Sequence, residues 1–103
     1  MYVLGIDFGG GACKATLLSK KGEVVATATS EYDTISGANG LREQIPLDWF
    51  DATVKNIKSI LNSPGINADE ILCVCFDAAT HTAVLMDEDF NVVRNSIYWT
   101  DTR

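Results

Sequence analysis

The chain has 103 residues, which suits one small domain, and 47% of them are hydrophobic, enough for a buried core. Its formal net charge of −6 at pH 7 argues against general binding to nucleic acids or to anionic membranes. No apolar run approaches the length of a bilayer span, and the N-terminus lacks the features of a signal peptide. We therefore expect a cytoplasmic protein.

The three cysteines agree with a reducing compartment. Cys73 and Cys75 lie two residues apart, and a disulfide within a regular strand is disfavoured because their Cα atoms would be about 6.6 Å apart. No CxxC pair is present, and a single histidine is too few for a common zinc pattern. The cysteines are therefore expected to be small buried hydrophobic residues.

The first segment of interest is residues 2–11, an apolar run followed by Asp7 and a glycine turn. The apolar run predicts a strand covered on both faces. A carboxylate after such a run is costly to desolvate unless a cation or hydrogen-bond donors meet it. Glycines 9–11 let another group approach the backbone closely, and successive turn amides can form an anion-binding nest. Asp7 could therefore hold Mg²⁺ next to a phosphate, or it could simply cap a hairpin turn.

Two further strands are predicted at residues 14–18 and 24–30, joined by a turn in which Gly22 can adopt a positive φ. With the first strand they form an antiparallel meander rather than a βαβ unit. The glycines do not follow the GxGxxG spacing, and no GxxxxGK[ST] motif is present. These features argue against a dinucleotide-binding fold.

A helix is predicted over residues 47–61, after a polar connecting loop at 31–39. Asp48 or a neighbour is expected to cap its start, and residues 63–65, Ser-Pro-Gly, to end it. The apolar residues at helical spacing are expected to pack in the core: Phe50, Val54, Ile57, Ile60 and Leu61.

Residues 71–76 predict a second buried strand, and residues 77–82 leave its carboxyl end. Residues 83–94 are expected to form a hairpin. The last residues, 97–103, are rich in aromatic and charged side chains and contain no stop signal, which suggests a piece of a longer protein. In that case the chain should expose apolar surface where the rest of the domain would pack.

The order of these elements, opening on Asp-x-Gly, resembles the ribonuclease H-like fold shared by actin, Hsp70 and sugar kinases. Within that group the chain resembles the N-terminus of an FGGY-type, xylulokinase-like carbohydrate kinase. Four segments carry the resemblance: Asp7-Phe8-Gly9 with Lys14, residues 43–49 (Glu-Gln-Ile-Pro-Leu-Asp-Trp), Thr80-His81, and Trp99-x-Asp101-x-Arg103. The resemblance implies an incomplete α/β domain: residues 1–103 would form the truncated N-terminal part of domain I, with a mixed sheet built from the meander, the helix and the buried strand.

The resemblance implies ATP-dependent phosphorylation of a sugar or polyol, with ATP and Mg²⁺ as cofactors. In that reaction the sugar hydroxyl attacks the γ-phosphate in line, and closure of two domains excludes water. The catalytic aspartate of the family would lie beyond Arg103, so the chain alone is expected to be inactive. The expected partner is a sugar or polyol, with no nucleic acid and no membrane; a homodimer of the full-length protein is left open.

The resemblance also implies two sets of site residues. The phosphate and Mg-ATP site would consist of Asp7, which is also the metal ligand, and of Gly9, Gly10, Gly11 and Lys14. The sugar site would consist of Thr80, His81, Trp99, Asp101 and Arg103. Plainer structural roles stay open: Lys14 could be a solvated strand lysine, His81 a loop residue, Trp99 a core residue, and Asp101 could pair with Arg103. The family segment residues Glu43, Gln44 and Trp49 are expected to order the loop before the helix rather than to touch substrate.

The sequence departs from the family at two places. Gly10 and Gly11 replace hydroxyl residues, which leaves backbone amides alone to contact phosphate, and residues 79–82, Ala-Thr-His-Thr, leave the sugar undetermined. The first departure supports an alternative: a non-catalytic sugar-binding or sensor pseudokinase on the same fold. A structural half-domain without binding of its own is a third reading. An aspartic protease would need a second Asp-x-Gly, and the DFG-like residues 7–9 lack the other protein-kinase motifs.

Overall fold

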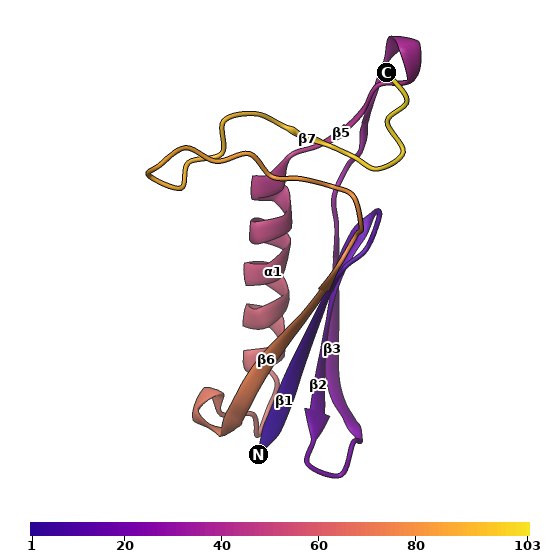
Figure 1. Cartoon of the computed structure of the whole chain (residues 1–103). Coiled ribbons are helices and arrows are strands. Elements are labelled where there is room, and N and C mark those ends of the chain that lie inside the picture. Colours follow the sequence, from indigo (N-terminus) through magenta and orange to yellow (C-terminus); the bar gives the residue numbers. More distant parts are fainter.

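The computed structural model describes residues 1–103 and contains two sheets and one long helix (Figure 1). The larger sheet has the strand order β3-β2-β1-β6, and the smaller has the order β4-β5-β7. The strands are β1 (Tyr2–Phe8), β2 (Ala12–Ser19), β3 (Val24–Glu31), β4 (Ile35–Ser36), β5 (Arg42–Gln44), β6 (Ile71–Ala78) and β7 (Ser96–Ile97). The helices are α1 (Pro46–Leu61) and two short 3₁₀ turns, η1 (Ala38–Gly40) and η2 (Ala68–Glu70).

The predicted meander and the mixed α/β class are confirmed. β1 pairs antiparallel with β2, and β2 with β3, whereas β6 joins the free edge of β1 in parallel. The turn between β2 and β3 places Gly22 at φ +81°, a conformation that glycine adopts without steric cost. Its amide donates to the carbonyl of Ser19 at 2.9 Å.

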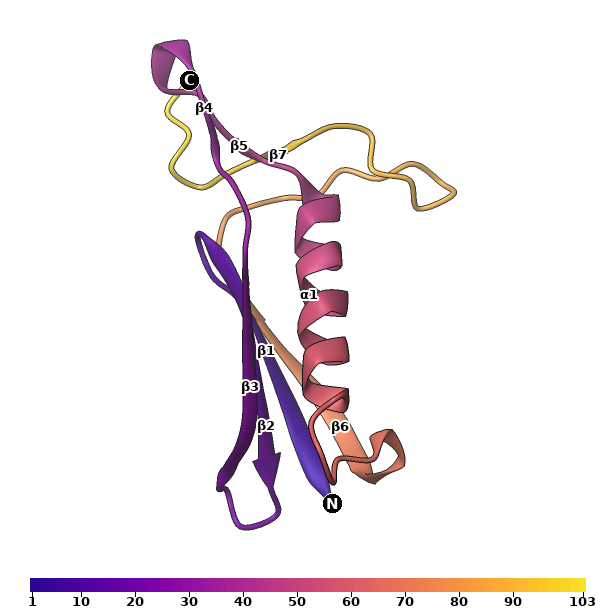
Figure 2. The ribbon, with the colours of Figure 1, turned by 180° about the vertical axis from the view of Figure 1, so that it is seen from behind.

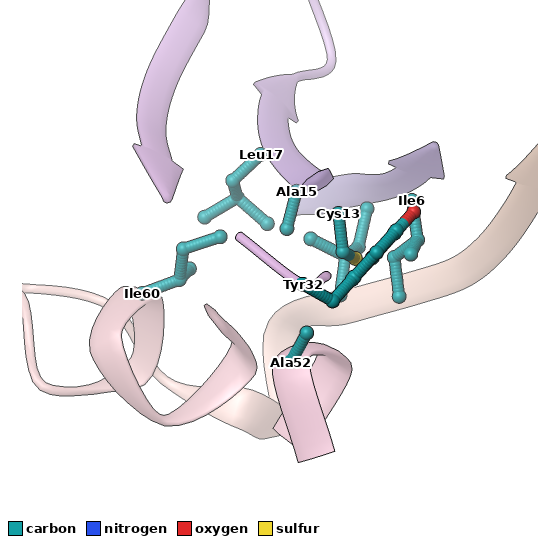
Figure 3. Packing of buried hydrophobic residues seen from close by; sticks show 8 residues of the cluster. Ile6, Cys13, Ala15, Leu17, Tyr32, Ala52 and Ile60 are labelled. Atoms are coloured by element: carbon teal, nitrogen blue, oxygen red, sulfur yellow. The ribbon is translucent and has the colours of Figure 1, made fainter. Parts of the chain in front are cut away.

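The core lies between α1 and strands β1, β2 and β3 of the larger sheet (Figures 2 and 3). Side chains alternate between the two faces of a strand, and every second residue of β2 therefore points at the helix. The buried hydrophobic residues are Leu4, Ile6, Cys13, Ala15, Leu17, Tyr32, Ala52 and Ile60. One polar link crosses this core: Asn56 accepts from Ser30 at 2.6 Å and donates to the carbonyl of Cys13 at 2.8 Å. Its amide is therefore satisfied despite burial.

The predicted apolar stripe of the helix is wrong at Phe50, whose side chain is 64% exposed. The face that meets the sheet carries Ala52, Asn56 and Ile60. Phe50 lies two residues before Ala52, about 200° away around a helix of 3.6 residues per turn. The expected capping by Asp48 is also wrong: Ile45 is the N-cap without a side-chain hydrogen bond, and Pro46 takes the first helical position.

The predicted burial of β6 is wrong as well. Leu72 and Phe76 are 58% and 65% exposed, and Cys73 and Cys75 are exposed rather than buried. The physical reason is the position of β6, which pairs only with β1 and lies outside the area that α1 covers. The expectation that the chain exposes apolar surface is therefore confirmed.

The connecting segments hold more structure than the sequence predicted. Residues 31–45 include β4, η1 and β5. Strands β4 and β5 form the smaller sheet together with β7, near the start of α1 (Figure 2). The predicted hairpin at 83–94 forms without regular strands: Met86 and Val92 make one antiparallel bridge, and the amides of Asp87 and Val93 donate to the carbonyls of Asn91 and Leu85, each at 3.0 Å. None of the helices has both the length and the apolar character needed to cross a membrane.

Candidate functional site

The glycine turn between β1 and β2 is held through its carbonyl groups. The phenol of Tyr32 donates to the carbonyl of Gly9, and its backbone amide donates to Gly11 at 3.1 Å. The side-chain amide of Gln44 donates to the carbonyl of Gly10 at 2.7 Å. Burial raises the pKa of Tyr32 to about 12, so its phenol stays a hydrogen-bond donor at neutral pH. All three glycine carbonyls are therefore held in place from elsewhere in the fold.

The backbone amides of the same turn, unlike its carbonyl groups, are mostly without a hydrogen-bond partner. Gly9 donates to the carbonyl of Ala12 at 2.9 Å, but the amides of Gly10 and Gly11 donate to no protein acceptor. A Cβ atom added at Gly11 would meet nothing within 4 Å, so the space beside it is open. Gly10 and Gly11 are both exposed, so their adjacent unpaired amides are available to an anion. None of the three glycines has a positive φ, so backbone strain does not require glycine here; at Gly9 a Cβ atom would lie 3.2 Å from the carbonyl oxygen of Ala12, so a close contact favours glycine at that position.

Gln44 connects this turn to the start of α1. Its side chain is 1% exposed, and its oxygen accepts from the indole of Trp49 at 3.0 Å. Its nitrogen also donates to the hydroxyl of Thr34 at 2.8 Å. The sequence predicts that Glu43, Gln44 and Trp49 order the loop, but nothing in it indicates the contact of Gln44 with Gly10. Tyr32 also carries no signal in the sequence, because it is a single tyrosine in a polar loop.

Asp7 and Lys14 lie directly opposite each other on β1 and β2. Their neighbours Ile6 and Ala15 are buried on the helix side, so both charged side chains lie on the opposite face of the sheet. Neither residue takes part in an ion pair. Asp77 of β6 is in register with Asp7, so three charged residues from three strands share this row. The sequence analysis gave Asp77 no role, because the register of the two strands could not be read from the chain.

A metal at Asp7 would have to draw most of its ligands from outside the chain. No group of three or more histidine, cysteine or acidic side chains is brought together anywhere in the chain. Mg²⁺ is commonly bound by one or two carboxylates together with water and substrate phosphates. The exposed carboxylate of Asp7, close in sequence to the unpaired turn amides, fits that pattern.

The predicted sugar residues lie at the same end of the sheet. β1 and β6 are parallel, with Phe8 opposite Ala78, so the glycine turn and residues 79–82 leave the same edge (Figure 1). Ligands of open α/β sheets bind at such carboxyl ends. His81 adopts φ +52°, unusual for a residue with a side chain, and its Nδ1 lies 2.9 Å from the hydroxyl of Thr80.

Trp99 is brought to this segment by its backbone. Its amide donates to the hydroxyl of Thr82 at 3.2 Å, and its side chain is 56% exposed. The side chains of His81 and Trp99 are thus both exposed at one end of the molecule. They do not line the large apolar hollow of about 770 Å³, which lies between the start of α1, β6 and residues 84–92. On the sheet side of that hollow Phe8 stacks on Phe76, with ring centroids 6.1 Å apart.

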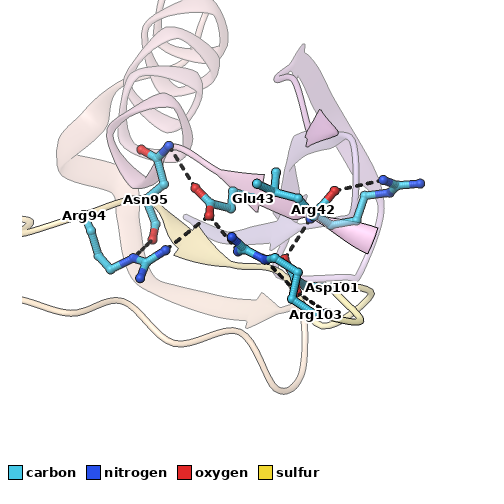
Figure 4. A network of polar contacts seen from close by, with 7 residues as sticks. Arg42, Glu43, Arg94, Asn95, Asp101 and Arg103 are labelled. Carbon is cyan, nitrogen blue, oxygen red and sulfur yellow. Dashed lines mark hydrogen bonds and ion pairs between the residues drawn. The ribbon is translucent and has the colours of Figure 1, made fainter. Parts of the chain in front are cut away.

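Asp101 and Arg103 bind each other in a polar network centred on Glu43 (Figure 4). Arg103 lies 2.9 Å from Asp101 and 2.7 Å from Glu43, and Asp101 also accepts from the backbone amide of Arg42 at 2.8 Å. The hydrogen bond from Arg103 lowers the pKa of both carboxyl groups, and these carboxylates raise the pKa of Arg103. The sugar-binding roles of Asp101 and Arg103 remain predictions.

Comparison with known proteins decides the family. The model of the "FGGY family of carbohydrate kinases, N-terminal domain" matches residues 2–103. The chain belongs to the FGGY family. This FGGY chain is 35% identical over 102 residues to the xylulose kinase of Bacillus subtilis, covering 99% of the chain and 20% of that relative. It is 28% identical over 103 residues to the glycerol kinase of Mycoplasmopsis pulmonis, again with 99% and 20% coverage.

Solved structures show the same likeness. The xylulose kinase of Rhodospirillum rubrum superposes with a TM-score of 0.92 at 26% identity, covering 100% of the FGGY chain and 21% of that structure. The gluconate kinase of Lactobacillus acidophilus superposes with a TM-score of 0.87 at 28% identity, with 97% and 20% coverage. The predicted family and fold are therefore confirmed. The FGGY chain spans about a fifth of the length of the curated relatives it matches.

Proposed function

We propose that residues 1–103 are the N-terminal part of domain I of a carbohydrate kinase, which transfers the γ-phosphate of ATP to a hydroxyl of a sugar or polyol. The observation that carries the proposal is the glycine turn, whose carbonyls are all held while the amides of Gly10 and Gly11 are unpaired. Phosphate oxygens only accept hydrogen bonds, so they match two adjacent donors. Phosphoryl transfer depends mainly on such positioning and charge stabilisation.

Within this proposal each residue of the phosphate site has one task. The amides of Gly10 and Gly11 donate to phosphate oxygens, and Lys14 supplies a positive charge on the neighbouring strand. Asp7 would hold Mg²⁺, directly or through water, and would thereby place positive charge beside the phosphates. The chain offers no proton acceptor for the attacking hydroxyl, and a residue outside it would fill that role.

The sugar side of the proposal rests on the exposed residues at the carboxyl end of β6. Thr80 and His81 would hydrogen-bond sugar hydroxyls, and Trp99 would stack on an apolar sugar face. Asp101 and Arg103 would contribute through the network that holds them near this end. The names of the relatives make xylulose the first substrate to try, with gluconate and glycerol next.

A second candidate, a non-catalytic sugar-binding protein on the same fold, is favoured by one observation. Positions 10 and 11 carry no side chains, so the turn offers no hydroxyl of its own to a phosphate. A protein of that kind would bind sugar without consuming ATP.

The test is a coupled ADP-release assay on the protein as its gene encodes it, with xylulose, gluconate and glycerol. The proposal expects sugar-dependent turnover that falls sharply in Asp7→Asn, with sugar affinity by calorimetry unchanged. Sugar binding without turnover would favour the sensor, and neither binding nor turnover would contradict both candidates. The 103-residue chain by itself should show no turnover, since the loss of general-base assistance alone costs about 10²–10⁴-fold. Turnover by this chain that Asp7→Ala abolished would overturn that expectation.

A further inference from the structure

Tyr98 places its phenol directly over the glycine turn. A Cβ atom built at Gly10 would lie 2.8 Å from the Tyr98 hydroxyl oxygen, closer than such atoms are found in proteins. That oxygen therefore occupies the space that a side chain at position 10 would take. Tyr98 is separated from the turn by most of the chain, so only the fold brings the two together.

The Tyr98 hydroxyl has no hydrogen-bond partner within the protein. Its backbone amide and carbonyl are both paired, with Arg42 at 3.0 Å and with Asp101 at 2.8 Å, but its phenol oxygen makes no bond. Tyrosine hydroxyls in partly buried positions usually find a partner. The amides of Gly10 and Gly11 at the same turn are also unpaired. Three hydrogen-bond donors without protein acceptors thus gather at one place.

The phenol is held there by the same strand that holds the turn. β5 accepts the Tyr98 amide through the carbonyl of Arg42, and its Gln44 side chain donates to Gly10. The ring of Tyr98 also meets Trp99 edge to face, with centroids 6.0 Å apart. The position of the hydroxyl relative to the turn is therefore set by β5 rather than by a flexible side chain alone.

From this geometry we propose that the Tyr98 hydroxyl is a phosphate-binding group, which donates a hydrogen bond to the oxygen atoms that the Gly10 and Gly11 amides also bind. The inference rests on the proposed phosphate site and adds a side-chain donor to it. A ligand with several acceptor oxygens and no donors satisfies all three groups at once. The polyphosphate of a nucleotide has that chemistry.

The simplest alternative is that the ring of Tyr98 only packs against the turn. Tyr98→Phe distinguishes the two interpretations, because it keeps the ring and removes the hydroxyl. Gly10→Ser in the Tyr98→Phe background then places a new hydroxyl in the space that the phenol oxygen has left. The backbone permits this change, since φ of Gly10 is not positive. Tyr2→Phe is the matched control, because Tyr2 lies at the far end of β1 and its hydroxyl makes no hydrogen bond within the protein.

The experiment measures the Kd of inorganic tripolyphosphate by calorimetry, on the protein as its gene encodes it, together with KM for ATP and for xylulose. Tyr98→Phe should weaken tripolyphosphate binding about tenfold, as expected for a hydrogen bond to a charged group. It should raise KM for ATP and leave KM for xylulose unchanged. The Tyr98→Phe, Gly10→Ser double variant should recover most of the lost affinity, and Tyr2→Phe should change nothing.

The outcomes separate this inference from the kinase assignment. Unchanged tripolyphosphate affinity in Tyr98→Phe overturns the role of Tyr98, even when turnover and its dependence on Asp7 are found. Tripolyphosphate binding that depends on Tyr98, in a protein without sugar-dependent turnover, supports the role of Tyr98 and overturns the kinase. Failure of wild type to bind tripolyphosphate, or an equal loss in Tyr2→Phe, overturns the inference. Loss of affinity in Tyr98→Phe that Gly10→Ser does not recover shows that a hydroxyl in this space does not bind the phosphate, and overturns the inference as well.

Discussion

Strands β2 and β6 of the larger sheet differ in burial although both contain apolar residues. In β2, Cys13, Ala15 and Leu17 are completely buried beneath α1. In β6, which is the more continuously apolar strand, Leu72 and Phe76 are more than half exposed. The difference follows from coverage, because α1 packs against β2 and β3 and leaves β6 open. A run of apolar residues therefore predicts a strand, but its neighbours decide whether that strand is buried.

At the carboxyl ends of the strands, the side chains that support the glycine turn also differ in burial from the groups proposed to bind a ligand. Side chains such as Gln44 and Tyr32, which support the glycine turn, are buried and fully hydrogen-bonded. The groups that we propose to bind a ligand are exposed or unpaired: the carboxylate of Asp7, the turn amides and the Tyr98 hydroxyl. A rigid support beneath free donors is the arrangement expected of a preorganised anion site.

The largest difference in stability should come from replacing one leucine in β2 and one in β6. In the 103-residue chain, Leu17→Ala should lower the free energy of unfolding by about 2–5 kcal/mol, because it opens a cavity in the core. Leu72→Ala removes the same atoms from a side chain that is 58% exposed, and should cost less than about 1 kcal/mol. Urea unfolding followed by circular dichroism measures both. Equal losses would mean that β6 is covered in solution, for example by self-association, which sedimentation would detect.

A smaller effect is expected at the support of the glycine turn. Gln44→Leu leaves the carbonyl of Gly10 and the indole of Trp49 without their partner, and should lower the free energy of unfolding by about 1–3 kcal/mol in all, because both groups are only partly buried and water can replace part of the lost bonding. Thr34→Val is the milder control, since it removes only one acceptor of Gln44 and leaves the bond to Gly10 intact. Gln44→Leu should therefore lower the free energy of unfolding more than Thr34→Val does. A larger loss in Thr34→Val would show that Gln44 does not hold the turn.

The smallest effect concerns pH and the network around Arg103. The pKa values of Glu43 and Asp101 are lowered in the folded protein, chiefly by hydrogen bonds from Arg103. Protons therefore bind the unfolded chain first on acidification, so the network stabilises the fold above about pH 4–5 and loses that contribution as the pH falls further. Glu43→Gln should lower stability at pH 7 and make less difference at pH 3. Glu31→Gln, at an exposed carboxylate without an ion pair, is the control. A difference between wild type and Glu43→Gln that stays constant from pH 7 to pH 3 would contradict the linkage.

Local sequence determined the elements and the family. The meander, the turn at Gly22 and the body of α1 follow from periodicity and turn chemistry, which act over a few residues. The ordered motifs pointed to FGGY kinases, which the family match confirmed. The placement of Asp7 near the end of the first strand, next to a glycine turn, was also readable, because it depends only on neighbours along the chain.

Only the tertiary structure decided which faces are buried and which groups meet. Phe50 and the β6 residues are exposed because of where α1 lies, and no local pattern carries that information. The contacts of Gln44 and Tyr98 with Gly10 join positions far apart in the sequence, through strands of two and three residues that have no periodicity to read. The physical reason is that hydrogen-bond pairing and coverage are relations between distant segments, and these exist only once the chain has folded.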